Sequence, residues 1–169
     1  MDTLFHIAFH TEFGWMRAVS DGKALIRLDW DQTQWSESDN PDDVSRETMH
    51  QINAYLDGKL QNFTVPLNPM DATSTAKDWL TTMSTIPYGS LWTYKEFAEA
   101  AGKPGAARAA GTSCSSNPIP IIYPCHRVVR ADRSLGNYGG GSMLAPTHPS
   151  NLGRKAALIK LESNNAATF

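Results

Sequence analysis

The chain has 169 residues, enough for one domain or two small ones, and its 41% hydrophobic and 19% charged residues indicate a folded globular protein rather than a disordered one. No apolar run is long enough to span a bilayer, and the N-terminus lacks the pattern of a signal peptide. Two cysteines without such a signal predict a reducing, cytoplasmic setting. They are also too few for a zinc site made of cysteines alone.

Charge is distributed unevenly along the chain. Residues 1–75 hold five basic and twelve acidic residues, a charge of −7, whereas residues 76–169 hold ten basic and five acidic residues, a charge of +5. Such asymmetry indicates two units with different tasks, and a basic surface attracts phosphates. On charge alone, an ordinary solvated surface is an equally good interpretation of the basic half.

The first half of the chain has the pattern of a small α/β unit. Asp21-Gly22 is a hairpin signal, and apolar residues at helical spacing predict a helix over residues 44–56 that ends before Gly58. Residues 61–71 contain two prolines and read as an extended linker. A three-stranded meander is expected over residues 4–9, 15–19 and 24–30. We place the domain boundary between residues 72 and 73.

The second half has the pattern of helices. An apolar stripe predicts a helix over residues 76–85, and a final helix is expected over residues 151–162 with Asn151 as its N-cap. Between them, Thr93 and Glu96 have capping-box spacing, and Gly102 ends the helix that they begin. A second helix over residues 105–114 follows after a tight turn, which is the pattern of a helix-turn-helix.

That second helix is composed almost entirely of small residues, with one long cation, Arg108, in its middle. Alanine- and glycine-rich helices are most often packed tightly inside a core. An arginine is costly in such a core when it is unpaired, so Arg108 favours a helix that approaches nucleic acid.

The sequence Pro-Cys-His-Arg-Val at residues 124–128 is the strongest chemical signal. Cys125 is a soft nucleophile in its thiolate form, and the adjacent His126 is able to take its proton directly or through water. The preceding segment, residues 118–124, has three prolines, which fix φ and hold the thiol on a stiff support.

Several short motifs occur in order along the second half of the chain: Tyr94, residues 107–111, Asn117-Pro118, residues 124–128, Tyr138-Gly139-Gly140, and the spaced set Lys155, Leu158 and Glu162. In their order and spacing they resemble the O6-alkylguanine-DNA alkyltransferase family. The resemblance is close over residues 76–169 and looser over the N-terminal strands. It implies a ribonuclease-H-like α/β N-terminal domain as scaffold, and a mainly α C-terminal domain with a winged-helix-like helix-turn-helix.

The resemblance implies direct-reversal DNA repair, in which an alkyl group moves irreversibly from guanine O6, and conceivably from thymine O4, to Cys125 after the nucleotide is flipped out. His126 would act as a water-mediated base and Glu162 would orient it. Asn117 would brace the site, and Tyr94 would help to rotate the nucleotide and donate a proton. Arg108 would occupy the vacated space in the stack, because a base inside a duplex is out of reach of a thiolate.

The resemblance also implies further contact residues and partners. The expected partner is double-stranded DNA, bound through the minor groove by a monomer without an obligate protein partner, and no cofactor is implied. The cysteines of the zinc site that some members carry are absent here, so no metal is expected. The DNA-binding set is Thr93, Tyr94, Ala107, Arg108, Ala109, Gly111 and Arg127. The substrate pocket is expected from Pro120, Val128, Tyr138, Gly139 and Gly140.

Two features depart from the family pattern. Gly139 stands where relatives often have Ser or Ala, and residues 142–153 form about a dozen extra residues beside the expected pocket. We interpret this segment as a loop that alters which alkyl groups fit. The principal alternative function is a non-catalytic alkyltransferase-like protein that flags lesions, but such proteins lack the cysteine that is present here. A regulator signalling by cysteine alkylation and a cysteine hydrolase explain less of the chain.

Overall fold

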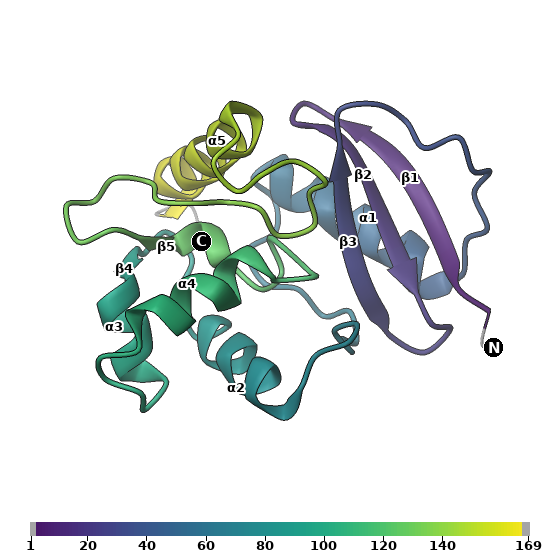
Figure 1. The fold of residues 1–169 in the computed structure, drawn as a ribbon. Helices are drawn as coiled ribbons and strands as arrows, with labels where there is room; N and C mark the ends of the chain where they lie inside the picture. Colours follow the sequence, from purple (N-terminus) through teal and green to yellow (C-terminus); the bar gives the residue numbers. More distant parts are fainter. Residues whose placement is uncertain (1–2, 167–169) are drawn as a thin grey trace. The chain divides into compact units, whose positions relative to one another are not determined.

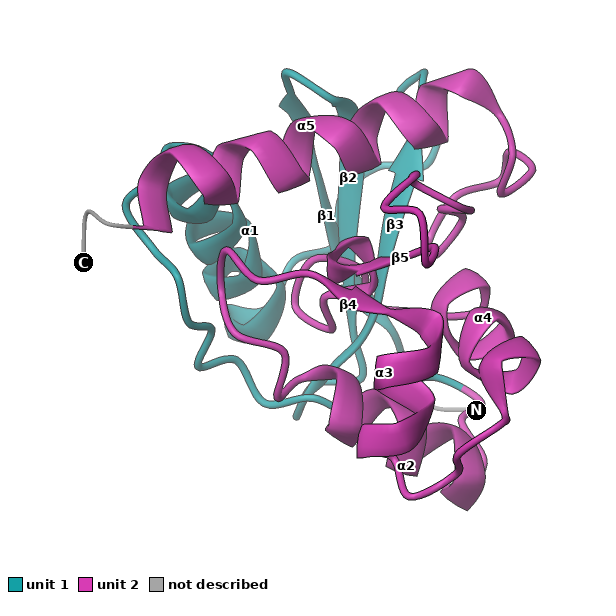
Figure 2. Ribbon diagram, turned by 90° about the vertical axis from the view of Figure 1, so that its left-hand side faces the viewer, with its two compact units in different colours: residues 1–70 teal, residues 71–169 magenta. Residues whose placement is uncertain are grey.

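The computed structural model describes residues 3–166, and the chain divides into two compact units, Met1–Met70 and Asp71–Phe169 (Figures 1 and 2). This division lies two residues before the boundary predicted from the sequence. Within the described residues, no helix combines the length and the apolarity needed to cross a membrane.

The first unit is built on an antiparallel meander in the order β1-β2-β3 (Figure 1). Met16 and Ala18 of the central strand pair with Trp30 and Leu28 of the next strand, and all four are buried. One face of the sheet is therefore apolar, because successive side chains of a strand point to opposite faces. The strands are β1 (Phe5–Thr11), β2 (Gly14–Ser20) and β3 (Leu25–Asp31).

Helix α1 (Asp43–Leu56) packs against β1 and β2. It begins with a capping box in which the Asp42 carboxylate accepts a bond from the Ser45 amide and the Ser45 hydroxyl accepts one from the Asp42 amide. Its buried residues include Ile52 and Tyr55, which lie on the predicted apolar stripe. The helix predicted over residues 44–56 is confirmed.

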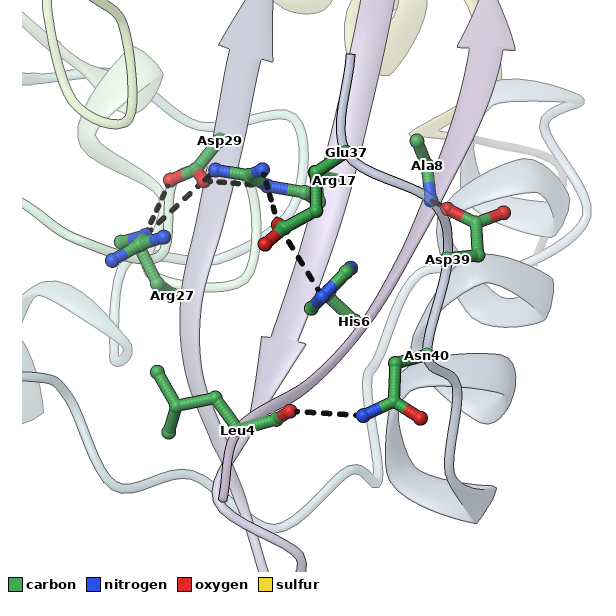
Figure 3. Close-up of polar contacts among 9 residues, drawn as sticks. All are labelled: Leu4, His6, Ala8, Arg17, Arg27, Asp29, Glu37, Asp39 and Asn40. Carbon is green, nitrogen blue, oxygen red and sulfur yellow. Dashed lines mark hydrogen bonds and ion pairs between the residues drawn. The ribbon is translucent and has the colours of Figure 1, made fainter. Parts of the chain in front are cut away.

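The other face of the sheet is polar and is crossed by the loop that follows β3 (Figure 3). Asp29 accepts hydrogen bonds from Arg17 and Arg27, while Glu37 of the loop lies within ion-pair distance of both Arg17 and His6. Hydrogen bonds of Asp39 and Asn40 to β1 and to the residue before it hold the loop in place. The charged side chains on this face therefore pair with one another, and Glu37 connects the loop to the sheet.

The second unit is mainly helical, and α3 and α4 pack against each other and against α2 (Figure 2). Thr93 and Glu96 form the predicted capping box at the start of α3, with each side chain bonded to the other residue's amide. The elements are α2 (Ser74–Met83), β4 (Trp92–Thr93), α3 (Tyr94–Ala100), α4 (Ala107–Ser115), the 3₁₀ turn η1 (Cys125–Arg127), β5 (Val128–Val129) and α5 (Pro149–Asn165).

The start of the last helix differs from the prediction. Helix α5 begins at Pro149, and its N-cap is His148, whose Nδ1 accepts a hydrogen bond from the Ser150 amide. Proline is well suited to this position because it has no amide hydrogen to satisfy. Asn151 lies inside the first turn, where its Nδ2 donates to two backbone carbonyls of the preceding loop. The expectation that Asn151 is the N-cap was wrong.

Candidate active site

The Cys125 thiol is buried at the first position of η1, with 1% of the residue exposed. Asn117 Nδ2 donates to its sulfur at 3.2 Å and to the Tyr123 carbonyl at 2.8 Å, and Asn117 Oδ1 accepts from the Ile119 amide at 3.0 Å. The side chain of Asn117, itself 1% exposed, therefore joins the thiol to the segment that leads up to it.

The segment before the thiol contains backbone strain. Ile121 has φ of +72°, in the left-handed region that β-branched residues rarely adopt, and it is buried. Such a conformation costs on the order of 1–3 kcal/mol and persists only where the surrounding structure imposes it. The prolines predicted a stiff support for Cys125, and the strained turn at Ile121 adds to that stiffness.

His126, Arg127 and Glu162 form a buried network. His126 Nε2 lies 2.7 Å from Glu162 Oε2, and Arg127 donates to the same carboxylate through Nε at 2.8 Å and Nη2 at 3.0 Å. The Gly89 amide donates to Glu162 Oε1 at 3.2 Å, and Arg127 Nη1 donates to the Ile86 carbonyl at 2.6 Å. The carboxylate therefore fixes the orientation of the imidazole next to the nucleophile.

The charges and burial of this network determine the protonation states of His126 and Glu162. Burial lowers the pKa of His126 below its usual 6.5, despite the opposing charge of Glu162. Burial alone would raise the pKa of Glu162, but His126 and Arg127 hold that pKa well below its usual range. A neutral imidazole beside an ionised carboxylate carries its proton on Nε2, so Nδ1 is the nitrogen that is able to accept a proton.

The Cys125 side chain is a neutral thiol at rest. Burial raises the pKa of Cys125 to about 11, and the hydrogen bond from Asn117 and the positive charge of Lys155 oppose that rise. A thiol with this pKa contains almost no thiolate at neutral pH, so a base must take its proton during reaction. This requirement fits the placement of His126.

Lys155 is a site residue for which the sequence suggested no role. It is fully buried in α5, and its Nζ donates to the carbonyls of Val128 at 2.7 Å and Asn137 at 3.1 Å, and also to that of Leu135. Burial lowers the pKa of Lys155 to about 8. The spacing from Lys155 to Glu162 puts both on one face of α5, which was the signal available in the sequence.

We expect Lys155→Met to lower the transfer rate by about tenfold and the free energy of unfolding by about 2 kcal/mol. The substitution removes a cation that opposes the rise in the Cys125 pKa, and it leaves one buried carbonyl, that of Val128, and two part-buried carbonyls without their donor. Urea unfolding and the rate of reaction with free O6-benzylguanine measure the two effects. Lys160→Met, at an exposed position of the same helix, is the matched control. Equal rates in the two variants would contradict this role.

Arg127 belongs to the predicted DNA-binding set, but in the structure its side chain is buried in the network with Glu162. Its side chain is 8% exposed and is bound to Glu162 and to the Ile86 carbonyl, so it is not available to a phosphate. Thr93 is also buried, and its hydroxyl is occupied in capping α3. Ala107, Arg108 and Ala109, by contrast, are exposed on the first turn of α4.

A hollow of about 390 Å³ lies beside that turn. Arg108 lines it from α4 and Arg130 from the residue after β5, and Tyr94 supplies an aromatic wall. Burial raises the pKa of Tyr94 to about 12, so its hydroxyl remains a proton donor at neutral pH. The remaining lining residues are Ala107, Gly111, Gly136 and Asn137.

The predicted pocket residues lie deeper and do not line this hollow. Gly140 is packed closely, because a Cβ there would lie 2.7 Å from the Asn117 carbonyl oxygen. A Cβ at Gly139 would lie 2.9 Å from Pro146, so the glycine and the extra loop fit each other. All five residues of the set are buried: Pro120, Val128, Tyr138, Gly139 and Gly140.

Comparisons with known proteins agree with this architecture. Residues 75–164 match the family model for the 6-O-methylguanine DNA methyltransferase, DNA binding domain, and residues 4–69 match the model for its ribonuclease-like domain. The chain belongs to the 6-O-methylguanine DNA methyltransferase family. The predicted fold, a ribonuclease-like α/β domain followed by a helical DNA-binding domain, is confirmed.

Relatives and solved structures are similar over most of the chain. Methylated-DNA–protein-cysteine methyltransferases of Methanosarcina barkeri and Mycobacterium leprae are 42% and 41% identical, over 71% and 72% of this chain and 69% and 67% of theirs. The structure of Mycobacterium tuberculosis OGT in complex with DNA has a TM-score of 0.79 at 32% identity, covering 95% of this chain and 93% of that one. The relatives are named as methyltransferases, which favours catalysis over the lesion-flagging alternative.

Proposed function

We propose that this protein repairs DNA by transferring an alkyl group from guanine O6 to Cys125, once per molecule. The observation that supports this most directly is the buried thiol of Cys125, bonded to Asn117 and adjacent in sequence to the His126–Glu162 pair. A general base oriented by a carboxylate next to a cysteine is the arrangement that activates a thiol. Thymine O4 lesions are a second substrate class to test.

The proposed reaction is a displacement at the alkyl carbon. His126 Nδ1 receives the thiol proton through a water molecule, and Glu162 stabilises the resulting imidazolium. The sulfur forms a bond to the alkyl carbon as the bond from that carbon to O6 breaks. Tyr94 donates a proton to the departing guanine, which its pKa of about 12 permits because the hydroxyl is protonated beforehand.

Access to the lesion requires that the nucleotide leave the duplex. Helix α4 presents the exposed residues Ala107, Arg108 and Ala109, and its N-cap, Ala106, makes no side-chain capping bond. The small side chains allow DNA to approach, and Arg108 occupies the space left in the stack. Gly111 lies behind this turn, where a Cβ would only just contact Tyr94 at 3.9 Å.

Peptide mass spectrometry after incubation with a duplex containing one O6-methylguanine tests the proposal. We expect one methyl group on the peptide that contains Cys125, and recovery of unmodified guanine in equal amount. Tight binding to the lesion with an unmodified Cys125 would overturn the proposal and support lesion flagging.

The pH dependence tests the role of His126. Because the pKa of His126 is lowered from 6.5, the imidazole stays a neutral base below pH 6.5. We therefore expect the rate with free O6-benzylguanine to change little from pH 7.5 to 6.5 and to fall at lower pH as His126 takes up a proton. A rate that rises about tenfold per pH unit from 6.5 to 8 would show that the thiol titrates without this base.

The extra loop is shorter than the predicted segment of residues 142–153, because α5 begins at Pro149. Residues 142–148 are held by bonds from the Tyr138 amide to the Pro146 carbonyl at 2.9 Å and from Asn151 Nδ2 to the Ala145 carbonyl at 2.9 Å. We propose that this loop limits which alkyl groups fit. Shortening it should change the ratio of rates on methyl and benzyl lesions, and an unchanged ratio would refute the proposal.

We also propose an assembly state and a cellular location. The protein acts as a monomer on double-stranded DNA, without an obligate protein partner, in the cytoplasm and at the nucleoid if the source is bacterial. Sedimentation of the free protein and of its complex with a short duplex measures the first of these. A stable dimer in the absence of DNA would contradict it.

A further inference from the structure

Arg130 and Arg108 face the same hollow from different elements of the second unit. Arg108 is the second residue of α4, and Arg130 directly follows β5. No carboxylate lines this hollow. A concave surface with two cations and no counter-ion is suited to an anion.

These two arginines differ from five of the chain's six other arginines; the sixth, Arg154, is buried and donates to Asn151 Oδ1 at 2.9 Å. Arg17, Arg27, Arg46, Arg127 and Arg133 each lie within ion-pair distance of an Asp or Glu. Within residues 3–166, neither Arg108 nor Arg130 has such a carboxylate partner. Both are exposed, so both keep a full charge available to a ligand.

Arg130 is also held in place by its own turn. Its amide donates to the Ser134 carbonyl at 3.0 Å, and its carbonyl accepts from the Arg133 amide at 2.9 Å. The nearest acidic residue in sequence, Asp132, accepts bonds from the Ser134 amide and hydroxyl at 3.0 and 2.6 Å. The Asp132 carboxylate is therefore bonded to Ser134. It also attracts Arg130 electrostatically, but among the described residues it forms no ion pair with the guanidinium, which lines the hollow.

The floor of the hollow is shaped for close approach. Gly136 has φ of +73°, and a Cβ there would lie 2.8 Å from the Tyr94 hydroxyl, so only glycine leaves this space open. Ala107 and Gly111 add no bulk on the other wall. A sugar-phosphate chain is able to run between the two arginines next to the tyrosine that the proposed function assigns to nucleotide rotation.

We infer that Arg130 binds a backbone phosphate of the lesion strand in this hollow, opposite Arg108, and holds the strand while the nucleotide turns out. This inference rests on the proposed function and adds to it a residue that neither the resemblance nor the thiol network indicates. A guanidinium binds phosphate through paired, charge-assisted hydrogen bonds, and Arg130 is placed to do so. Arg108 has a different role in the proposed function, in which it fills the space that the flipped nucleotide leaves in the base stack. These two roles agree with the absence of an ion-paired carboxylate at Arg108 and at Arg130 among residues 3–166.

The test compares Arg130→Ala and Arg130→Lys with Arg133→Ala. Arg133 is exposed in the same turn, but it is bonded to the Leu91 carbonyl and paired with Glu96. The affinity for an undamaged duplex is measured over a range of KCl concentrations. We expect Arg130→Ala to weaken binding about tenfold and to reduce the salt slope by about one, whereas Arg133→Ala keeps the wild-type slope. Arg130→Lys should keep the slope, because the charge remains.

A second measurement separates DNA contact from damage to the site. The rate of transfer from a lesion duplex should fall by a larger factor in Arg130→Ala than the rate with free O6-benzylguanine, which has no phosphate. Equal factors, or a salt slope equal to that of wild type, would overturn the inference and leave the proposed function intact. A wild-type protein that binds DNA without alkylating Cys125 would instead refute the proposed function, and the salt slope would still decide the role of Arg130.

Discussion

Replacing Cys125 with Ser should reduce alkyl transfer by a factor on the order of 10³ or more while leaving lesion binding in place. A hydroxyl is a far weaker nucleophile than a thiol, and its proton is too tightly held for the neighbouring imidazole. The fold should tolerate the change, because serine is similar in size and Asn117 Nδ2 is able to donate to its hydroxyl as it now donates to the sulfur. Mass spectrometry of the protein and anisotropy on a lesion duplex measure the two properties.

Cys114→Ala is the matched control for this substitution. Cys114 is the chain's other cysteine; it is buried in α4, and burial raises its pKa well above 9.0. It is not followed by a histidine in the sequence, in contrast to Cys125, so it should behave as a small apolar residue. Cys114→Ala should retain stoichiometric alkylation of Cys125. An alkyl group found on Cys114, or continued transfer by Cys125→Ser, would show that the nucleophile has been assigned wrongly.

The sequence predicted the regular elements because their signals are local. Hairpin residues, a capping box at Thr93 and Glu96, and helical apolar spacing each act over a few residues, and each element lies within a few residues of the prediction. The strands β4 and β5 were missed because each has two residues, too few for an alternating pattern. The start of α5 was misplaced because His148 and Asn151 are both acceptable caps, and Pro149 decided between them.

The prediction of the site used residue type and could not include contacts that depend on long-range packing. The assignment of Arg127 to DNA followed from the family resemblance, but its partners Glu162 and Ile86 lie more than 30 residues away in the sequence. No role was predicted for Lys155 for the same reason, because its acceptor carbonyls at Val128 and Asn137 lie 27 and 18 residues away in the sequence. The left-handed backbone at Ile121 has no sequence signal, since the residue type disfavours it.

Replacing Glu162 with Gln should have the largest effect on stability. Its carboxylate, 2% exposed, accepts bonds from His126, Arg127 and the Gly89 amide. A glutamine keeps the shape but puts an amino group opposite one of these donors and leaves the buried guanidinium without a counter-ion. Removing one partner of a buried pair costs about 3–5 kcal/mol, a large part of a typical free energy of unfolding. Urea unfolding measures this cost, and Glu99→Gln, an exposed position in α3, should change it by less than about 0.5 kcal/mol.

The pH dependence of that difference identifies its electrostatic origin. The pKa of Glu162 is lowered in the folded state from 4.5, so its stabilisation is present above pH 4.5 and is lost as the pH falls toward the folded-state value. The gap between wild type and Glu162→Gln should therefore be widest near neutral pH and narrow below 4.5. Loss of the imidazole's orienting partner should also slow transfer under conditions where the variant is folded. A variant as stable and as fast as wild type would mean that the carboxylate neither holds Arg127 nor orients His126, which would leave Cys125 without an oriented base.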